Sequence, residues 1–120
     1  MKTIKFALII ACLLVSGSIF AGQVEVVDAR VKSLGNKQFR FDVTLQHEDA
    51  GWKHYANRWE ILDSDGNILA TRTLYHPHVN EQPFTRSLTA TIPDSHKSVI
   101  IRGHDSVHQY GKKQLTLDLP

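Results

Sequence analysis

The chain has 120 residues, with 14 Lys and Arg against 12 Asp and Glu and a formal net charge of +2. A short basic start at residues 1–5 precedes an apolar run at 6–15 and a small-residue exit that ends at Ala21. This order is typical of a secretory signal peptide. We predict cleavage after Ala21 and a mature chain, residues 22–120, that is periplasmic or secreted. Cleavage removes two lysines, so the mature chain carries 12 charges of each sign and no net charge that favours nucleic acid or a membrane as a partner.

Cys12 is the only cysteine and lies inside the predicted signal peptide. A mature chain without thiols has no disulfide, no cysteine nucleophile, no zinc–thiolate site and no iron–sulfur cluster. The pair Ala11-Cys12 allows the alternative that the chain is a lipoprotein. The apolar residues 13–15 that follow favour the interior of a signal peptide instead.

Alternation of apolar and polar side chains dominates the rest of the chain, and this period of two predicts strands. In chain order, strands are predicted at 27–31, 39–45, 55–63, 68–75 and 84–92, with a sixth that begins at 99–101 and a seventh at 115–119. Tight turns are predicted at 34–37, 64–67 and 93–95. No apolar stripe with helical spacing runs for three turns, so the sequence predicts no helix after the signal peptide.

Seven short strands separated by regular turns are the pattern of a β-sandwich. We therefore predict an all-β fold, a seven-stranded immunoglobulin-like β-sandwich that forms a single domain over residues 22–120. Trp59 on the third strand is predicted to lie in the core, as a tryptophan does in immunoglobulin domains. A small barrel is the alternative, because buried faces alone do not separate the two folds.

Six of the seven histidines fall in three predicted loops, at 47–54, 76–83 and 104–112. In an immunoglobulin-like topology the loops after the second, fourth and sixth strands lie at the same end of the molecule, and the short turns lie at the other. We predict that the histidine-rich end is the functional one, because loops on a rigid scaffold commonly carry binding residues.

The predicted site combines two pairs of histidines from neighbouring loops. His76 and His78 flank Pro77, which favours extended backbone and places both rings on one side. The predicted ligands of one divalent ion are His76, His78, His104 and His108, with His54 as the substitute. Imidazole ligands without thiolates favour Zn²⁺, Cu²⁺ or Ni²⁺, and we expect Zn²⁺ or Cu²⁺. Asp105 or Glu81 is expected to accept a hydrogen bond from a ligand ring.

The metal-free alternative is that these histidines hydrogen-bond among the loops and hold this end rigid. His47 continues the alternation of residues 39–45 and is interpreted as a hydrogen-bonded histidine at a strand end. The residues His104, Asp105 and Ser106 are of the types found in a catalytic triad. Neighbours on an extended chain point to different sides, however, so they do not form the relay.

Three segments carry a resemblance. They are His54-Tyr55-Ala56 with Trp59-Glu60, the stretch 74–87 with its His-Pro-His and Glu-Gln-Pro-Phe-Thr-Arg-Ser motifs, and His104-Asp105-Ser106-Val107-His108. Together they cover most of residues 50–111 and resemble a family of short, uncharacterised secreted or periplasmic bacterial proteins. The resemblance implies export and supplies no activity.

The leading hypothesis is a small exported binding domain that holds a divalent transition metal at its histidine-rich end. The alternative is a metal-free interaction or adhesion module that binds another exported protein through loop aromatics, namely Trp52, Tyr55, Tyr75 and Tyr110. A third hypothesis is an enzyme that acts through a bound metal, which requires an open coordination position. The sequence assigns no catalytic residue.

Overall fold

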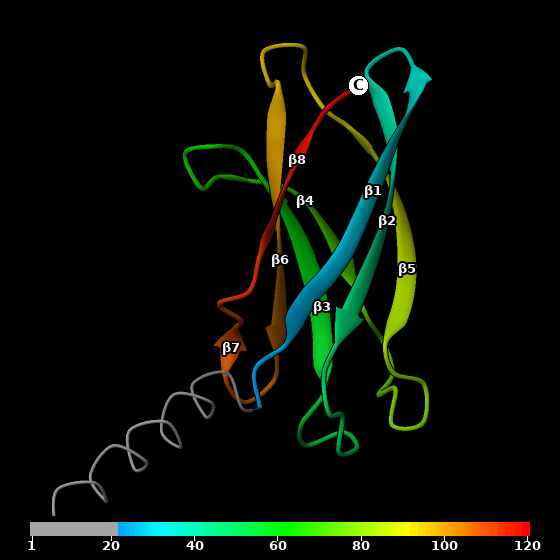
Figure 1. The fold of residues 1–120 in the computed structure, drawn as a ribbon, viewed down its shortest axis with the longest axis vertical. Coiled ribbons are helices and arrows are strands. Elements are labelled where there is room, and N and C mark those ends of the chain that lie inside the picture. Colours follow the sequence, from blue (N-terminus) through cyan, green and yellow to red (C-terminus); the bar gives the residue numbers. More distant parts are fainter. Residues whose placement is uncertain (1–21) are drawn as a thin grey trace, which may run out of the picture.

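The computed structural model describes residues 22–120, and the predicted signal peptide with Cys12 lies outside the described residues. Eight strands follow one another along residues 22–120, and no helix lies between them (Figure 1). They are β1 (Glu25–Gly35), β2 (Gln38–Gln46), β3 (Ala56–Leu62), β4 (Ile68–Thr73), β5 (Phe84–Thr91), β6 (Ser98–Asp105), β7 (Gln109–Tyr110) and β8 (Leu115–Asp118). This part of the chain accordingly contains no helix long and apolar enough to cross a membrane.

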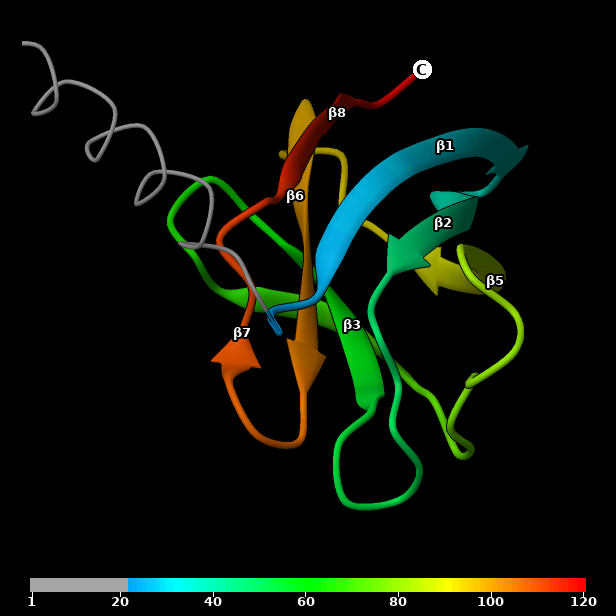
Figure 2. The ribbon, with the colours of Figure 1, turned by 60° about the horizontal axis from the view of Figure 1, so that its bottom comes forward.

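The strands form two antiparallel sheets. One has the order β1-β2-β5, and the other has the order β4-β3-β6-β7 with β8 also paired to β6. Figure 2 shows the two sheets as separate layers. The prediction of an all-β fold is confirmed for residues 22–120, while the immunoglobulin-like arrangement stays a prediction. The structure has one strand more than predicted, because β7 is two residues long and too short to show alternation in the sequence.

The core lies between the two sheets. Phe41, Val43 and Leu45 of β2 are fully buried, and they pack in one cluster with Trp59 and Ile61 of β3. The prediction that Trp59 lies in the core is confirmed, because none of its surface is exposed. Burying a side chain of this size stabilises the fold by about 4–6 kcal/mol at the usual value per unit of apolar area.

Two strands carry their alternation past the apolar residues to a polar residue at the end. On β2 the buried positions Phe41, Val43 and Leu45 are followed by His47, which is also buried. On β6 every second residue is buried, and the last of this series is Asp105. Because side chains on a strand alternate between faces, both polar side chains point inward, between the sheets.

The loops β2–β3, β4–β5 and β6–β7 lie at the same end of the molecule, toward the bottom of Figure 1. The chain also enters β1 from this end. Gly22, just before β1, lies beside His47 and His108 of these loops. The β1–β2 hairpin lies at the opposite end, where Asn36 and Lys37 adopt positive φ values of 53° and 65° in a tight turn.

Candidate metal centre

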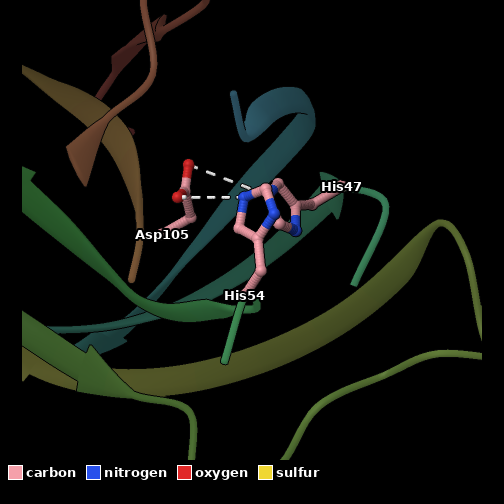
Figure 3. A group of neighbouring side chains, drawn as sticks. All are labelled: His47, His54 and Asp105. Atoms are coloured by element: carbon pink, nitrogen blue, oxygen red, sulfur yellow. Dashed lines mark ion pairs between the residues drawn. The ribbon is translucent and has the colours of Figure 1, made fainter. Parts of the chain in front are cut away.

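Three ligand-type side chains meet where β2 and β6 end. One ligand atom from each of His47, His54 and Asp105 lies within 4.8 Å of the other two, and we call this group the His–Asp cluster. Figure 3 shows the two rings and the carboxylate pointing toward one another. The side chains of His47 and Asp105 are fully buried, and that of His54 is 26% exposed. The cluster is therefore a nearly enclosed set of two imidazoles and one carboxylate.

His47 is fixed by hydrogen bonds on both its backbone and its ring. Its backbone N–H donates to Gln82 Oε1 at 3.0 Å. Its ring Nδ1 donates to Asp49 Oδ1 at 2.5 Å, and the same oxygen accepts the Ala56 N–H at 3.0 Å. A carboxylate on one nitrogen of a histidine sets the ring orientation and leaves the other nitrogen for a ligand. Here that other nitrogen is His47 Nε2.

His54 reaches the cluster through the fold of its own loop. The Ala50 N–H donates to the His54 carbonyl at 2.8 Å, which closes a tight turn within the β2–β3 loop. Next to it, the Tyr55 N–H donates to Ser106 Oγ at 3.1 Å, and the Ser106 N–H donates to the Tyr55 carbonyl at 3.0 Å. These reciprocal bonds tie the loop to the end of β6 and bring His54 beside Asp105.

One carboxylate oxygen of Asp105 accepts hydrogen bonds from the backbone, and the other does not. Its Oδ1 accepts the N–H groups of Val107 at 2.8 Å and His108 at 2.6 Å, which shapes the turn between β6 and β7. Its Oδ2 is buried without a hydrogen-bond partner among the described residues and lies 3.7 Å from His47 Nε2. The carboxylate is therefore held in place while one oxygen stays available.

A second atom of the cluster is also without a partner. His54 Nε2 is buried, makes no hydrogen bond within residues 22–120 and lies 3.4 Å from Asp105 Oδ1. Leaving a buried polar atom unsatisfied costs about 1–3 kcal/mol, so most such atoms in folded proteins have a partner. Two further buried atoms of residues 22–120, Trp59 Nε1 and His78 Nδ1, also have no partner, but the His–Asp cluster is where two such ligand atoms lie together.

His47 Nε2 faces oxygen atoms. It forms a hydrogen bond with the Gly22 carbonyl oxygen at 3.0 Å and lies 3.7 Å from Asp105 Oδ2. Both oxygens are acceptors, so either an N–H at Nε2 or a metal ion bound to Nε2 satisfies them.

His108 lies at the edge of the cluster. Its ring is exposed, and its centroid is 5.0 Å from that of His54, in an edge-on contact. The ring of His54 makes a similar contact with His47, at 4.8 Å. Three histidine rings therefore follow one another from the interior to the surface. Two of the predicted ligands, His54 and His108, belong to this row.

His76 and His78, the predicted pair of ligands in the β4–β5 loop, are not part of the His–Asp cluster. His76 is exposed, with its ring 6.3 Å from that of Trp52. His78 stacks on Phe84 at 4.0 Å, and Arg86 donates to its Nε2 at 2.9 Å. Burial lowers the pKa of His78, and the nearby Arg86 charge lowers it further. The expected acceptor Glu81 pairs with the same Arg86, at 3.1 Å.

His104 points away from the cluster. It alternates with the buried Gly103 and Asp105, so its side chain lies on the outer face of its sheet. Its Nδ1 donates to Asn57 Oδ1 at 2.6 Å, and its ring packs edge-on against Tyr110 at 4.9 Å. Burial lowers the pKa of His104, with the charge of Arg58 as a further cause.

Within residues 22–120 the His–Asp cluster is the one place where three such side chains gather. Of the five predicted ligands it contains His54, with His108 beside it. His47 and Asp105 were not among the predicted ligands. The signal that could have found them is the strand alternation, which already placed His47 on the buried face and which places Asp105 opposite to His104.

Comparison with known proteins gives one relative with clear sequence similarity. A protein of Halomicrobium mukohataei named "Putative lipoprotein" is 38% identical over 96 residues. The match covers 80% of this chain and 47% of that protein, so the chain spans about half the length of its relative. No protein-family model matches the chain.

Among solved structures, a superoxide reductase (1Fe-SOR) from Giardia intestinalis superposes on this chain with a TM-score of 0.48 and 14% sequence identity. The superposition covers 79% of this chain and 99% of the reductase chain.

Proposed function

We propose that this chain is an exported protein that binds one divalent transition-metal ion through His47, His54 and Asp105. The observation that carries the proposal is the pair of buried, unpartnered atoms, His54 Nε2 and Asp105 Oδ2, within reach of His47 Nε2. A metal ion gives both atoms a partner. Its positive charge also suits the oxygens of Gly22 and Asp105 that face His47 Nε2.

The spacing of the cluster suits an ion after a small contraction. Metal–nitrogen and metal–oxygen bonds of about 2.1 Å in a tetrahedral site place ligand atoms about 3.4 Å apart. Asp105 Oδ1 lies 3.4 Å from His54 Nε2 and Asp105 Oδ2 lies 3.7 Å from His47 Nε2, while one ligand atom from each of the three residues lies within 4.8 Å of the other two. The 26% exposure of His54 leaves its ring room to close the remaining gap.

The ligand set narrows the choice of ion. Imidazole and carboxylate ligands suit Zn²⁺ and Cu²⁺, the ions expected from the sequence, and two histidines with one carboxylate also suit Fe²⁺. Three protein ligands leave a coordination position for a water molecule or another ligand. A bound ion would supply Lewis-acid chemistry at that position, and the protein would supply the fixed imidazoles and the buried carboxylate.

Export is supported by the order of residues 1–21 and by the relative, whose name describes a lipoprotein. We propose a periplasmic or secreted location for this chain, with cleavage after Ala21. The lipoprotein alternative makes Cys12 the first residue of an anchored protein. The intact mass of the exported protein distinguishes cleavage after Ala21 from lipid attachment at Cys12, because the lipoprotein retains residues 12–21 and a lipid.

A second candidate function is a protein-interaction module, which the exposed aromatics at the same end favour. Trp52 is 65% exposed and Tyr75 is 68% exposed, and Trp52 packs edge-on against Tyr55 at 5.6 Å. Large exposed aromatics commonly anchor protein partners. A Trp52→Ala/Tyr75→Ala double variant is expected to keep metal affinity and to lose binding to an exported partner.

Calorimetric titration with Zn²⁺ and Cu²⁺ tests the metal site with two double variants. His54→Gln/Asp105→Asn removes two ligands while preserving the shape of the carboxylate, and His76→Ala/His78→Ala removes the pair predicted from the sequence. We expect wild-type protein and the His76/His78 variant to bind one ion at micromolar concentration or below, and the His54/Asp105 variant to lose this binding. If the His76/His78 variant loses binding and the His54/Asp105 variant keeps it, the site lies in the β4–β5 loop. A wild-type protein that binds only at millimolar concentration would refute the metal site.

A further inference from the structure

Gly22 lies against the His–Asp cluster, and it is also the residue that the predicted cleavage would expose. Its carbonyl oxygen is 3.0 Å from His47 Nε2. A Cβ built on Gly22 would lie only 2.5 Å from His108 Nε2, so the Gly22 backbone passes close to the His108 ring as well. The first residue of the predicted mature chain therefore lies between two imidazoles at the site.

We propose that Gly22 itself completes the metal site. Once cleavage has made Gly22 the first residue, its free α-amine and carbonyl oxygen bind the ion, and the His108 ring lies next to them and supports this binding. The inference rests on the proposed function, both for the metal at the His–Asp cluster and for cleavage after Ala21. It adds that signal-peptide removal creates a ligand, so that the exported form binds metal and the precursor binds it poorly.

The chemistry changes at the moment of cleavage. In the precursor the Gly22 nitrogen is a peptide nitrogen, whose lone pair is delocalised into the amide and is a poor ligand. After cleavage it is an amine, which gives up its proton far more readily than a lysine and then offers a lone pair. The amine and the carbonyl oxygen of the same residue can hold one ion in a five-membered ring.

The chain just after Gly22 is held firmly in place. Val24 is fully buried, and a Cβ on Gly103 would lie 3.0 Å from its side chain. The Lys112 N–H donates to Gln23 Oε1 at 3.2 Å, and the Val26 N–H donates to the Lys113 carbonyl at 3.1 Å. The amine is therefore attached to a segment with a fixed position, and binding an ion costs little ordering of the chain.

The absence of a side chain at position 22 fits this role. A Cβ at this position would lie 2.5 Å from His108 Nε2, so the exposed His108 ring would have to move, and the φ of 82° at Gly22 also favours glycine. Glycine lets the backbone of the first residue and the His108 ring share the same small space.

Two matched proteins test the inference, and every buried core residue lies between Val24 and Ile101, so both contain the complete core. The first is residues 22–120 with a free Gly22 amine, released by a protease that cuts before glycine. The second carries two additional residues before Gly22, so that the Gly22 nitrogen is a peptide nitrogen. Cu²⁺ and Zn²⁺ affinities are measured by competition with a chelator, and urea unfolding without metal shows that both proteins fold equally well.

We expect the extended protein to bind Cu²⁺ at least about tenfold more weakly, which is the usual scale for losing a group that supports a metal site. In the free-amine protein alone, isotopic labelling of glycine nitrogen should change the hyperfine pattern of bound Cu²⁺. His108→Ala should weaken binding by the free-amine protein. Equal affinities with no effect of labelling would overturn the role of Gly22 and leave the His–Asp site standing. If neither protein binds an ion, both the inference and the proposed function fail. An exported protein whose first residue is not Gly22 also overturns the inference.

Discussion

Asp49 is a buried carboxylate outside the proposed ligand set that still determines how the site is built. Its Oδ1 holds the His47 ring and the Ala56 N–H, and its Oδ2 accepts the His78 N–H at 2.6 Å. One side chain therefore connects the end of β2, the start of β3 and the β4–β5 loop. Its charge also raises the electron density on His47, which strengthens that ring as a ligand.

Replacing this carboxylate should weaken metal binding without removing a ligand. We expect Asp49→Asn to lower the affinity for Zn²⁺ by about 10–100-fold, because the His47 ring loses its charged acceptor. Chelator competition measures the change. Asp42→Asn is the matched control, since Asp42 lies on the outer face of β2 and bonds to Ser87. An Asp49→Asn protein with wild-type affinity would show that His47 is not a ligand.

Glu60 is another buried carboxylate, and it is paired on the outer face of its sheet. Arg58 and Arg102 each donate to it at 2.8 Å, and the Tyr110 hydroxyl donates at 3.1 Å. Burial raises the pKa of Glu60, but the hydrogen bonds from the two arginines and the tyrosine outweigh it, so the pKa is lowered overall. The folded protein therefore holds this group ionised at a pH where the unfolded chain takes up a proton.

This shift gives a signed dependence of stability on pH. The unfolded chain binds the proton first, near its ordinary pKa of 4.5, so the contribution of Glu60 is complete above that pH and is lost as the pH falls through the folded pKa. We expect Glu60→Gln to reduce the free energy of unfolding by about 3 kcal/mol at pH 7, because two partly buried arginines lose their partner, and by less at pH 3. Urea unfolding at both pH values measures this. Asp94→Asn, in an exposed pair with Lys37, is the control and should change little. An equal loss of unfolding free energy at pH 7 and pH 3 would contradict a lowered pKa for Glu60.

At the scale of elements, strand alternation explains both the success and the failure of prediction from sequence. The alternation of β2 predicted the strand and placed His47 inside. The same rule applied to β6 separates Asp105 from His104, but grouping residues by loop had joined His104 and His108 as a pair. The position of His54 could not be predicted, because it depends on the bonds between Tyr55 and Ser106, which are distant in the sequence.

The close approach of two elements near the site gives a prediction on stability. A Cβ on Gly111 would lie 1.8 Å from the Val24 carbonyl oxygen, a backbone atom that no side-chain rotation can move. We expect Gly111→Ala to lower the free energy of unfolding by about 3 kcal/mol, at the upper end for overpacking, since the segment before β1 must shift. Gly66→Ala is the comparison, because its Cβ would meet nothing within 4 Å and only its φ of 89° is unfavourable. It should cost about 1–2 kcal/mol. Thermal or urea unfolding measures the stability of both variants. Similar losses in the free energy of unfolding would mean that the segment before β1 shifts at little cost.

For the whole molecule, the two ends of the fold differ in how they are held together. The β1–β2 and β5–β6 connections are short, and the middle of the molecule is closed by apolar side chains from both sheets. At the histidine-rich end the interior is polar instead, with His47, Asp49 and Asp105 all buried. Alternation predicted the all-β fold and that the three histidine-rich loops share one end, and the functional role of that end stays a prediction. Alternation could not predict that buried carboxylates would close that end.

The proposed ligands come from different sheets, and this has a consequence for a chain whose described part contains no cysteine. His47 follows β2 of one sheet, and Asp105 ends β6 of the other. A bound ion would thus act as a removable cross-link between positions about 60 residues apart, for which loop-closure entropy alone predicts about 4 kcal/mol of stabilisation. We expect Zn²⁺ to raise the thermal midpoint of wild-type protein and to slow amide exchange at the ends of β2 and β6 together, with neither effect in His54→Gln/Asp105→Asn. The ion would then stabilise this fold as a disulfide stabilises others, with the difference that the concentration of the ion in the surroundings decides whether the cross-link forms.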